Sequence, residues 1–252
     1  MVIHSFVSAR INSSRLPNKC LLPFGNCNVL EHGIRRAKEN GLNPIVCTPS
    51  SNENDLIAEI AMKENVPCFR GHNDDRLRRW LNCALENNID AFHTVDVDDP
   101  FFDPEMMKLS FLTLLENNLD YVEPTKLSSD GNACVGYSLK TSFLLKACSL
   151  YSEGENSELL WNYLEAVEDR KSEILVQSKN FSSVNARLTL DYEEDYWLLS
   201  SICRILGNQA TRKDVDDLLT ANPNFKNINW FRNNQWKERQ LQPIEPIINN
   251  NL

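Results

Sequence analysis

The sequence lacks the features that mark secreted, membrane-spanning and nucleic-acid-binding proteins. The segment Met1 to Ser8 has no basic stretch followed by a long apolar run, so we do not expect a signal peptide. No apolar run approaches the roughly 18 residues needed to cross a bilayer. Basic residues are also in deficit, with 26 Lys and Arg against 35 Asp and Glu and a net charge of −9. We therefore expect neither a nucleic acid nor an anionic membrane as partner.

Paired cysteine motifs are missing as well. The eight cysteines form no Cys-x-x-Cys pair and no Cys–His cluster with the spacing of a zinc site. Several, such as Cys47 and Cys68, have apolar neighbours, where a cysteine behaves as a small hydrophobic residue. This pattern predicts free thiols and a reducing, cytoplasmic setting.

Length and composition indicate a globular chain with a sizeable core. The chain has 252 residues, of which 42% are hydrophobic and 24% charged, and it has no internal repeat and no long linker. We predict one domain over residues 1–220, with an inserted arm at about 121–186. Residues 221–252, rich in Asn, Gln and Pro, are predicted to form a partly irregular C-terminal extension.

Short apolar runs alternate with helical patterns in the first half, which predicts an α/β fold with a mostly parallel sheet covered by helices on both faces. The strands expected there are Ile3–Val7, Pro44–Thr48, Pro67–Phe69 and Ala91–Val97. The expected helices are Val29–Asn40, one capped within Ser50–Asn52 that runs through Glu64, one started by Asp74 and Asp75 that runs to about Asn87, and one with Pro104 in its first turn. The second half is less regular. Its expected strands are Tyr121–Glu123, Ala133–Ser138, Glu173–Gln177 and Arg187–Leu190, and its expected helices are Thr141–Tyr151, Ser157–Asp169 and Glu193–Leu206.

A polar loop follows the first predicted strand and carries three cations, Arg10, Arg15 and Lys19, without any acid. Ligands of open α/β sheets bind beyond the carboxyl ends of the strands, which is where this loop falls. Arg and Lys side chains, hydroxyls and backbone N–H groups together suit a polyphosphate. A solvated basic loop is the alternative. The candidate nucleotide-binding residues of the loop are Ser8, Ala9, Arg10, Ser13, Ser14, Arg15 and Lys19.

The loop resembles the signature of sugar-activating cytidylyltransferases, Ala-Arg-x-x-Ser-x-Arg-Leu-Pro-x-Lys-x-Leu. The matching residues are Ala9, Arg10, Ser13, Arg15, Leu16, Pro17, Lys19 and Leu21. The likeness is to the spore-coat polysaccharide biosynthesis F type, a branch of the acylneuraminate and 3-deoxy-manno-octulosonate cytidylyltransferases. It implies a Rossmann-like nucleotidyltransferase fold of three layers, and a homodimer formed through the second half. Relatives often carry Gly where this chain has Asn12 and Asn18, and Asn tolerates positive φ.

Two carboxylates are candidate Mg²⁺ ligands, because this cation prefers carboxylate and phosphate oxygens. Asp98 follows the fourth strand and matches the metal-binding Asp of the family's Gly-Asp-x-Pro-Leu, although Val97 replaces the Gly. Asp191 ends a segment that resembles the family's Arg-x-Thr-Val-Asp-x-x-Glu-Asp. Helix capping is the competing role for acids here, and we expect Asp103 before Pro104 to act as a cap.

A third segment, beginning at Phe69, resembles the family's Phe-Arg-Gly-x-x-Asp-Asp and implies that Arg70 and Asp74 belong to the nucleotide pocket. Arg76 and Arg78, in contrast, are predicted to face water.

The acceptor region departs from the family. Gly136 stands near the position where relatives carry an acid, so we expect an altered acceptor pocket. Its candidate contacts are Lys126, Asn132 and Tyr137.

The resemblance implies Mg²⁺-dependent transfer of CMP from CTP to a small anionic or sugar acceptor, with release of pyrophosphate. Arg10, Arg15 and Lys19 would bind the triphosphate, while Asp98 and Asp191 would hold the metal. Two other functions stay open. Asp96-Val97-Asp98 is an Asp-x-Asp motif, as in metal-dependent glycosyltransferases. A non-catalytic nucleotide-binding protein is the third possibility.

Overall fold

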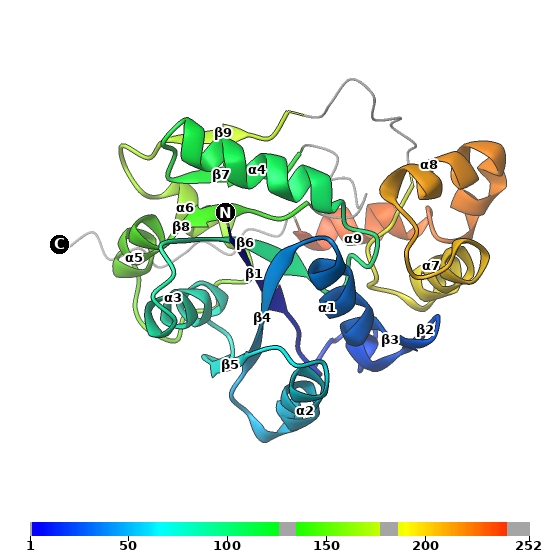
Figure 1. Ribbon diagram of the computed structural model, residues 1–252, viewed down its shortest axis with the longest axis horizontal. Coiled ribbons are helices and arrows are strands. Elements are labelled where there is room, and N and C mark those ends of the chain that lie inside the picture. The colour runs from blue at the N-terminus through cyan, green and yellow to red at the C-terminus, as the bar shows by residue number, and fades with distance from the viewer. Residues whose placement is uncertain (1, 126–134, 177–185, 241–252) are drawn as a thin grey trace.

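A seven-stranded sheet forms the centre of the computed structural model, which describes residues 2–125, 135–176 and 186–240 (Figure 1). The strand order is β5-β4-β1-β6-β8-β7-β9. β1, β4, β5 and β6 run parallel, as predicted, and β8 is antiparallel to both of its neighbours, β6 and β7. The strands are β1 Ile3–Ser8, β4 Leu42–Pro49, β5 Cys68–Gly71, β6 Ala91–Asp96, β7 Tyr121–Glu123, β8 Ser138–Lys140 and β9 Ser172–Ile174; β2 Pro23–Phe24 and β3 Cys27–Asn28 form a separate hairpin.

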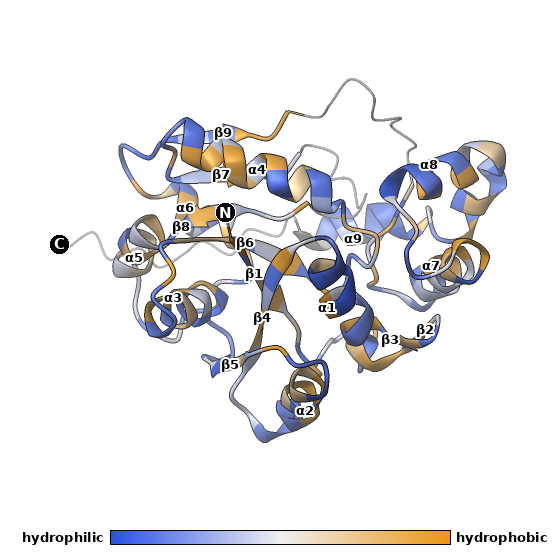
Figure 2. Cartoon of the chain, in the orientation of Figure 1, coloured by the Kyte–Doolittle hydropathy of each residue, from blue (hydrophilic) through white to orange (hydrophobic). Residues whose placement is uncertain are grey.

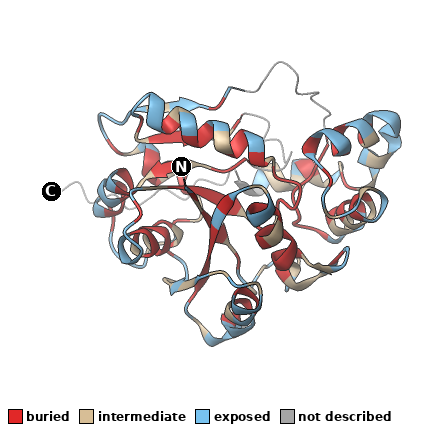
Figure 3. Cartoon of the chain, in the orientation of Figure 1, coloured by how far each residue is buried: buried red, intermediate tan, exposed pale blue. Residues whose placement is uncertain are grey.

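Helices cover both faces of the sheet and complete three layers. One apolar core joins α1, α2, α4 and α7 to one face, and a second core joins α3, α5 and α6 to the other. The helices are α1 Val29–Glu39, α2 Asp55–Lys63, α3 Arg76–Glu86, α4 Pro104–Glu116, α5 Thr141–Ser149, α6 Trp161–Glu165, α7 Glu193–Leu206, α8 Arg212–Ala221 and α9 Arg232–Gln240. The apolar residues of α1 lie on its buried face, whereas α4 carries apolar residues on both its buried and its exposed faces (Figure 2). The sheet between the layers is largely buried (Figure 3). The predicted fold class is confirmed.

Local sequence explains where several helices begin. Asn28 and Glu31 form a reciprocal capping box at α1, in which each side chain accepts a hydrogen bond from the other residue's backbone N–H. Asp103 caps α4 with Pro104 in the first turn, as predicted. Asp75 caps α3 through the N–H of Arg78. These caps fix the points at which the chain leaves the strand ends.

Three predicted elements differ in the structure. In place of the strand expected over Ala133–Ser138, the structure has β8, which begins at Ser138, and the described residues 135–137 before it are irregular. The segment Arg187–Leu190 was expected to be a strand, but it is irregular. Its backbone groups bond with a turn and with a side chain, not with a neighbouring strand. The N–H of Leu190 donates to the carbonyl of Asp98 at 2.7 Å, and the side chain of Asn229 donates to the carbonyl of Arg187 at 2.9 Å. The helix predicted over Ser157–Asp169 is limited to α6, because Ser157 turns toward α3 and bonds with Asp75.

The C-terminal extension is more regular than predicted as far as residue 240. It contains the 3₁₀ helix η4, Pro223–Ile228, and the helix α9. Two shorter 3₁₀ helices, η1 Lys19–Leu21 and η2 Asn52–Asn54, lie earlier in the chain. Among the described residues, no helix combines the length and the apolar character that a membrane span requires.

Candidate functional site

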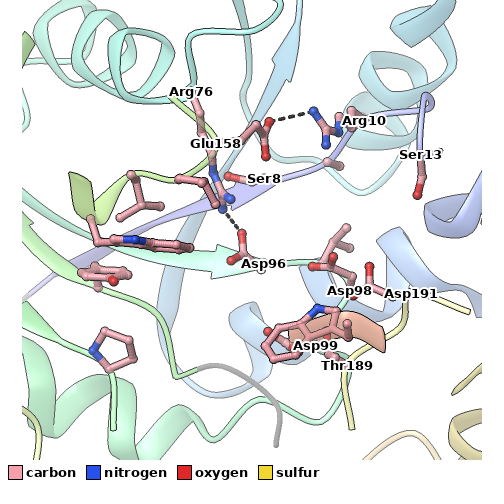
Figure 4. Close-up of a pocket in the computed structure, with 18 of the residues that line it drawn as sticks. Ser8, Arg10, Ser13, Arg76, Asp96, Asp98, Asp99, Glu158, Thr189 and Asp191 are labelled. Atoms are coloured by element: carbon pink, nitrogen blue, oxygen red, sulfur yellow. Dashed lines mark hydrogen bonds and ion pairs between the residues drawn. The ribbon is translucent and has the colours of Figure 1, made fainter. Parts of the chain in front are cut away.

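A cavity of about 840 Å³ lies at the carboxyl ends of β1 and β6. Ser8 and Asp96, the last residues of these strands, are register partners and both line it. The walls come from the loop after β1, the turn after β6, the segment that ends at Asp191, and helices α6 and α9. Figure 4 shows acids from these elements around one space, together with Arg10 of the loop and Arg76 of α3.

The loop after β1 is held in a fixed path by its backbone. The N–H of Ile11 donates to Asn54 Oδ1 at 3.0 Å, and the N–H of Asn18 donates to the carbonyl of Ile11 at 3.3 Å. Asn18 adopts the left-handed conformation with φ of 57°, which Asn tolerates, whereas Asn12 is not among the described residues with positive φ. The cavity receives the loop residues Ser8, Ala9, Arg10, Ser13, Ser14, Arg15 and Lys19.

Lys19 joins the two predicted metal-side acids. Its Nζ lies 2.5 Å from Asp98 Oδ2, 2.9 Å from Asp191 Oδ1 and 2.9 Å from the carbonyl oxygen of Leu190. Burial disfavours the charged ammonium, but the two carboxylates outweigh this and raise the pKa of Lys19 above its ordinary value. Lys19 is therefore a fixed cation between two acids from distant parts of the chain.

Asp191 is held by three cations. Arg15 Nη2 lies 2.5 Å from its Oδ1, and the fully buried Arg187 lies 3.3 Å from its Oδ2. Burial on its own would raise the pKa of Asp191, but Lys19 and Arg15 lower it well below the ordinary carboxyl value. Arg187 is itself fixed by Asp195, whose Oδ2 also accepts the backbone N–H of Asp191. Asp195 lies in the first turn of α7, as predicted, and its carboxylate orients the segment that precedes the helix.

Three acids cluster after β6. Carboxylate oxygens of Asp96, Asp98 and Asp99 lie within 4.8 Å of one another. Burial raises the pKa of Asp96 above its ordinary value, although Arg76 pairs with it directly. Because Asp96 is bound by Arg76, it differs from Asp98, whose partner Lys19 belongs to the loop. Two acids of the cluster therefore differ in their partners. Asp96 is paired with Arg76 of α3, whereas Asp98 shares Lys19 with Asp191.

A second pair of charges lies at the other end of the loop. Arg10 Nη1 donates to Glu158 Oε1 at 2.7 Å (Figure 4). Glu158 precedes α6, so the pair links the loop to the helical layer on the opposite face of the sheet.

Some predicted site residues do not reach the cavity. Arg70 is exposed and pairs with Asp55, while its guanidinium donates to the carbonyls of Ser50 and Ser51. Asp74 is also exposed, and neither Arg70 nor Asp74 lines the cavity. Arg70 is held by these partners on the surface, and Asp74 precedes the cap of α3, which is Asp75.

The acceptor candidates fall into two groups. Tyr137 lines the cavity, while Lys126 and Asn132 lie outside the described residues.

The two positions that depart from the family motif, Gly136 and Val97, both fit their surroundings. Gly136 has φ of +87°, and a Cβ there would lie 2.1 Å from the carbonyl oxygen of Thr94. The glycine is therefore required by the close approach to β6. Val97 is buried and faces Gly33 of α1, so the β-branched residue is accommodated there.

The structure adds residues that the sequence reasoning missed. Arg76 was predicted to face water, but it pairs with Asp96, packs 4.5 Å from the ring centre of Trp80 and lines the cavity. Arg78 is half-buried against Asp75 and does not face open water either. An Arg in the first turn after a strand end was a usable signal for Arg76. No sequence signal pointed to Glu158, or to Trp236 and Lys237 of α9, which also line the cavity.

Comparison with known proteins gives one consistent result. The family model described as cytidylyltransferase matches residues 5–136. An uncharacterized protein of Methanocaldococcus jannaschii is 30% identical over 237 residues, which is 91% of this chain and 95% of that protein. The spore coat polysaccharide biosynthesis protein SpsF of Bacillus subtilis is 22% identical over 243 residues, or 86% and 93% of the two chains. A solved cytidylyltransferase of Leptospira borgpetersenii superposes with a TM-score of 0.78 at 26% identity, covering 90% of this chain and 97% of that one.

Proposed function

The chain belongs to the cytidylyltransferase family and is a nucleotidyltransferase, and on this basis we propose that it transfers CMP from CTP to a sugar-type acceptor with release of pyrophosphate. The acceptors we propose are sugars, sugar acids and phosphorylated polyols of surface-polysaccharide or glycoconjugate synthesis. The relationship to a spore coat polysaccharide biosynthesis protein supports this range.

One observation carries the proposal: the loop cations and the acids that match the family's metal ligands meet in one cavity. Lys19 contacts Asp98 and Asp191, and Arg15 contacts Asp191. A triphosphate needs concentrated positive charge, and this chain of net charge −9 supplies it locally. Arg10, Ser13 and Ser14 extend the same wall and would bind the remaining phosphate oxygens.

The donor set fits a divalent cation. The ammonium of Lys19 already occupies a position between carboxylate oxygens of Asp98 and Asp191, with the carbonyl of Leu190 as a third oxygen. A hard cation such as Mg²⁺ prefers this kind of oxygen environment. We therefore propose that Asp98 and Asp191 hold Mg²⁺. When bound, the metal would neutralise phosphate charge and lower the pKa of the acceptor hydroxyl.

The chain's own residues would position the reactants and stabilise charge. In the proposed reaction an acceptor oxygen attacks the α-phosphorus of CTP, and the bond between that phosphorus and the oxygen of the β-phosphate breaks. Arg15 and Lys19 would bind the pyrophosphate as negative charge grows on it, a contribution typical of preorganised donors. Arg187 and Asp195 would keep Asp191 oriented, because they fix both its carboxylate and its backbone N–H.

A screen for pyrophosphate tests the proposal. The purified protein is incubated with Mg²⁺, each of the four nucleoside triphosphates and a panel of phosphorylated sugars, polyols and keto-acid sugars. We expect acceptor-dependent pyrophosphate release with CTP. Release of a nucleoside diphosphate from a nucleotide sugar would instead favour a glycosyltransferase with an Asp-x-Asp motif. The pairing of Asp96 with Arg76 argues against that use of the motif.

We also propose a cytoplasmic homodimer that associates through the arm. Ile174, at the end of the edge strand β9, and Val176, two residues beyond it, are 45% and 80% exposed, so apolar surface is open at this side of the arm. The seven cysteines among the described residues are free thiols, in keeping with a reducing compartment. Light scattering at micromolar concentration tests the dimer, and a monomeric mass for the wild-type protein would contradict it.

A further inference from the structure

Helix α9 brings two side chains, Trp236 and Lys237, into the wall of the cavity. The helix belongs to the C-terminal extension, beyond the part of the chain that matches the family model. It is also separate in the sequence from the loop after β1 and from Asp98 and Asp191. The question is therefore which part of the substrates Trp236 and Lys237 contact.

The segment that carries α9 is firmly docked. Arg232 makes two hydrogen bonds, of 3.0 and 2.8 Å, with the carboxylate of Glu194 in α7. Asn229 donates to the carbonyl of Arg187 and to Asp195 Oδ1, both at 2.9 Å. Asn229 and Asn233 are buried. These bonds run from the segment to α7 and to the stretch before it, so they hold the segment against both.

Trp236 lies against Arg187, which contacts the proposed metal ligand Asp191. The guanidinium carbon of Arg187 lies 5.3 Å from the centre of the Trp236 ring, within the range of a cation–π contact. The same guanidinium contacts Asp191 and Asp195. The indole therefore has one face fixed by Arg187, and it lines the cavity beside the acid proposed to hold the metal.

The charges of the cavity suggest what this wall binds. The other described cations that line it are Arg10, Arg15, Lys19, Arg76 and Arg79, all from the loop after β1 or from α3. Those of the loop suit the triphosphate. Lys237 comes from a different wall and adds positive charge apart from that loop. Cytosine carries no charge that would need a cation, whereas an anionic acceptor does.

We propose that Trp236 and Lys237 form the acceptor subsite, which selects an anionic sugar. The indole lies against the C–H face of the sugar ring, and Lys237 binds its carboxylate or phosphate. An aromatic side chain next to a cation in the wall of a cavity suits this kind of ligand. This inference rests on the proposed function, because it assigns the second substrate of the same reaction.

Steady-state kinetics with the acceptor found in the screen test the subsite. For Trp236→Ala and Lys237→Gln we expect the KM for the acceptor to rise at least tenfold, with the KM for CTP within twofold of wild type. Trp236→Phe and Lys237→Arg should recover most of the loss, because they retain the aromatic face and the charge. Asn234→Ala, at an exposed position of the same helix, is the matched control and should behave as wild type.

Other outcomes would overturn the assignment. A rise in the KM for CTP alone would mean that Trp236 stacks on the base, and wild-type kinetics in both variants would remove α9 from the site. Melting curves identify a variant that has lost the docking of α9; if Trp236→Ala is such a variant, Lys237→Gln decides. A carboxylate acceptor and a phosphate acceptor, compared in Lys237→Gln, show which anion the lysine binds.

Failure of the proposed function is a separate result. If the wild type releases no pyrophosphate with any acceptor, calorimetry in the presence of CTP and Mg²⁺ tests the subsite directly. Its probes are 6-phosphogluconate, which carries both anions, ribose 5-phosphate, gluconate and uncharged ribitol. The subsite predicts binding of an anionic probe that Lys237→Gln weakens at least tenfold. Equal binding of 6-phosphogluconate and ribitol would overturn it.

Discussion

The ammonium nitrogen of Lys19 lies 2.5 Å from Asp98 and 2.9 Å from Asp191, so one internal cation bridges two acids that are distant in the sequence. Without a cation between them, the two carboxylates would repel each other in a largely buried setting. A divalent ion bound there has to displace or shift Lys19. The released ammonium would then be available to the phosphate chain.

Replacement of Lys19 by Met should separate these roles. We expect the free energy of unfolding without Mg²⁺ to fall by about 3 kcal/mol, because two acids lose their common partner. Millimolar Mg²⁺ should then raise the melting temperature more in the variant than in wild type, because the metal no longer competes with the ammonium. Lys63→Met removes an exposed partner of Glu31 and should change neither quantity appreciably. An equal response to Mg²⁺ in both proteins would contradict the competition.

Asp98→Asn and Asp191→Asn should each lower Mg²⁺-dependent pyrophosphate release by roughly 10²–10³-fold, as expected for removal of one charge-stabilising group. Both changes keep the side-chain size and remove the charge. Asp74→Asn is the matched control, because Asp74 is exposed and does not line the cavity. Near-normal release in Asp98→Asn would show that the metal assignment is wrong.

Gly136→Ala should destabilise the protein by about 3 kcal/mol, because the new Cβ would collide with the backbone of β6 as well as strain a positive φ. Gly154 has a similar φ of +89° with no atom within 4 Å of an added Cβ. Gly154→Ala should therefore show only the conformational strain, about 1–2 kcal/mol. Urea unfolding of the two variants measures the difference. Equal destabilisation would mean that β6 moves aside at Gly136.

Mild acid should destabilise the protein through His32 and His93. Burial lowers the pKa of each to about 4, while the Nε2–H groups donate to the carbonyls of Pro100 and Val135. The unfolded state, with ordinary pKa values near 6.5, binds more protons, so stability falls as pH drops below about 6.5. Between pH 7.5 and 5.5 we expect a loss of roughly 2.5 kcal/mol from the two histidines together. In His32→Gln, which cannot titrate, the loss measured by urea unfolding should be about half as large. A pH-independent free energy of unfolding in wild type would contradict this account.

The sequence predicted the parts of the molecule that depend on local pattern. Alternating strands and helices gave the parallel half of the sheet, and the cap at Asp103 followed from its place before Pro104. The loop from Ser8 to Lys19 indicated the family, because its Arg, Ser and Lys residues stand at a characteristic spacing. Such features are encoded within a few neighbouring residues, so they can be read before the chain is folded.

Only the tertiary structure decided how these parts meet. Arg187–Leu190 resembles a strand, yet its backbone bonds with the turn at Asp98 and with Asn229 of the extension. Arg76 looked like a surface residue until β6 placed Asp96 beside it. Trp236 lines the cavity with its ring against Arg187, which lies far earlier in the chain. Contacts of this kind are set by packing between distant segments and by the satisfaction of buried charges, which a local pattern does not contain.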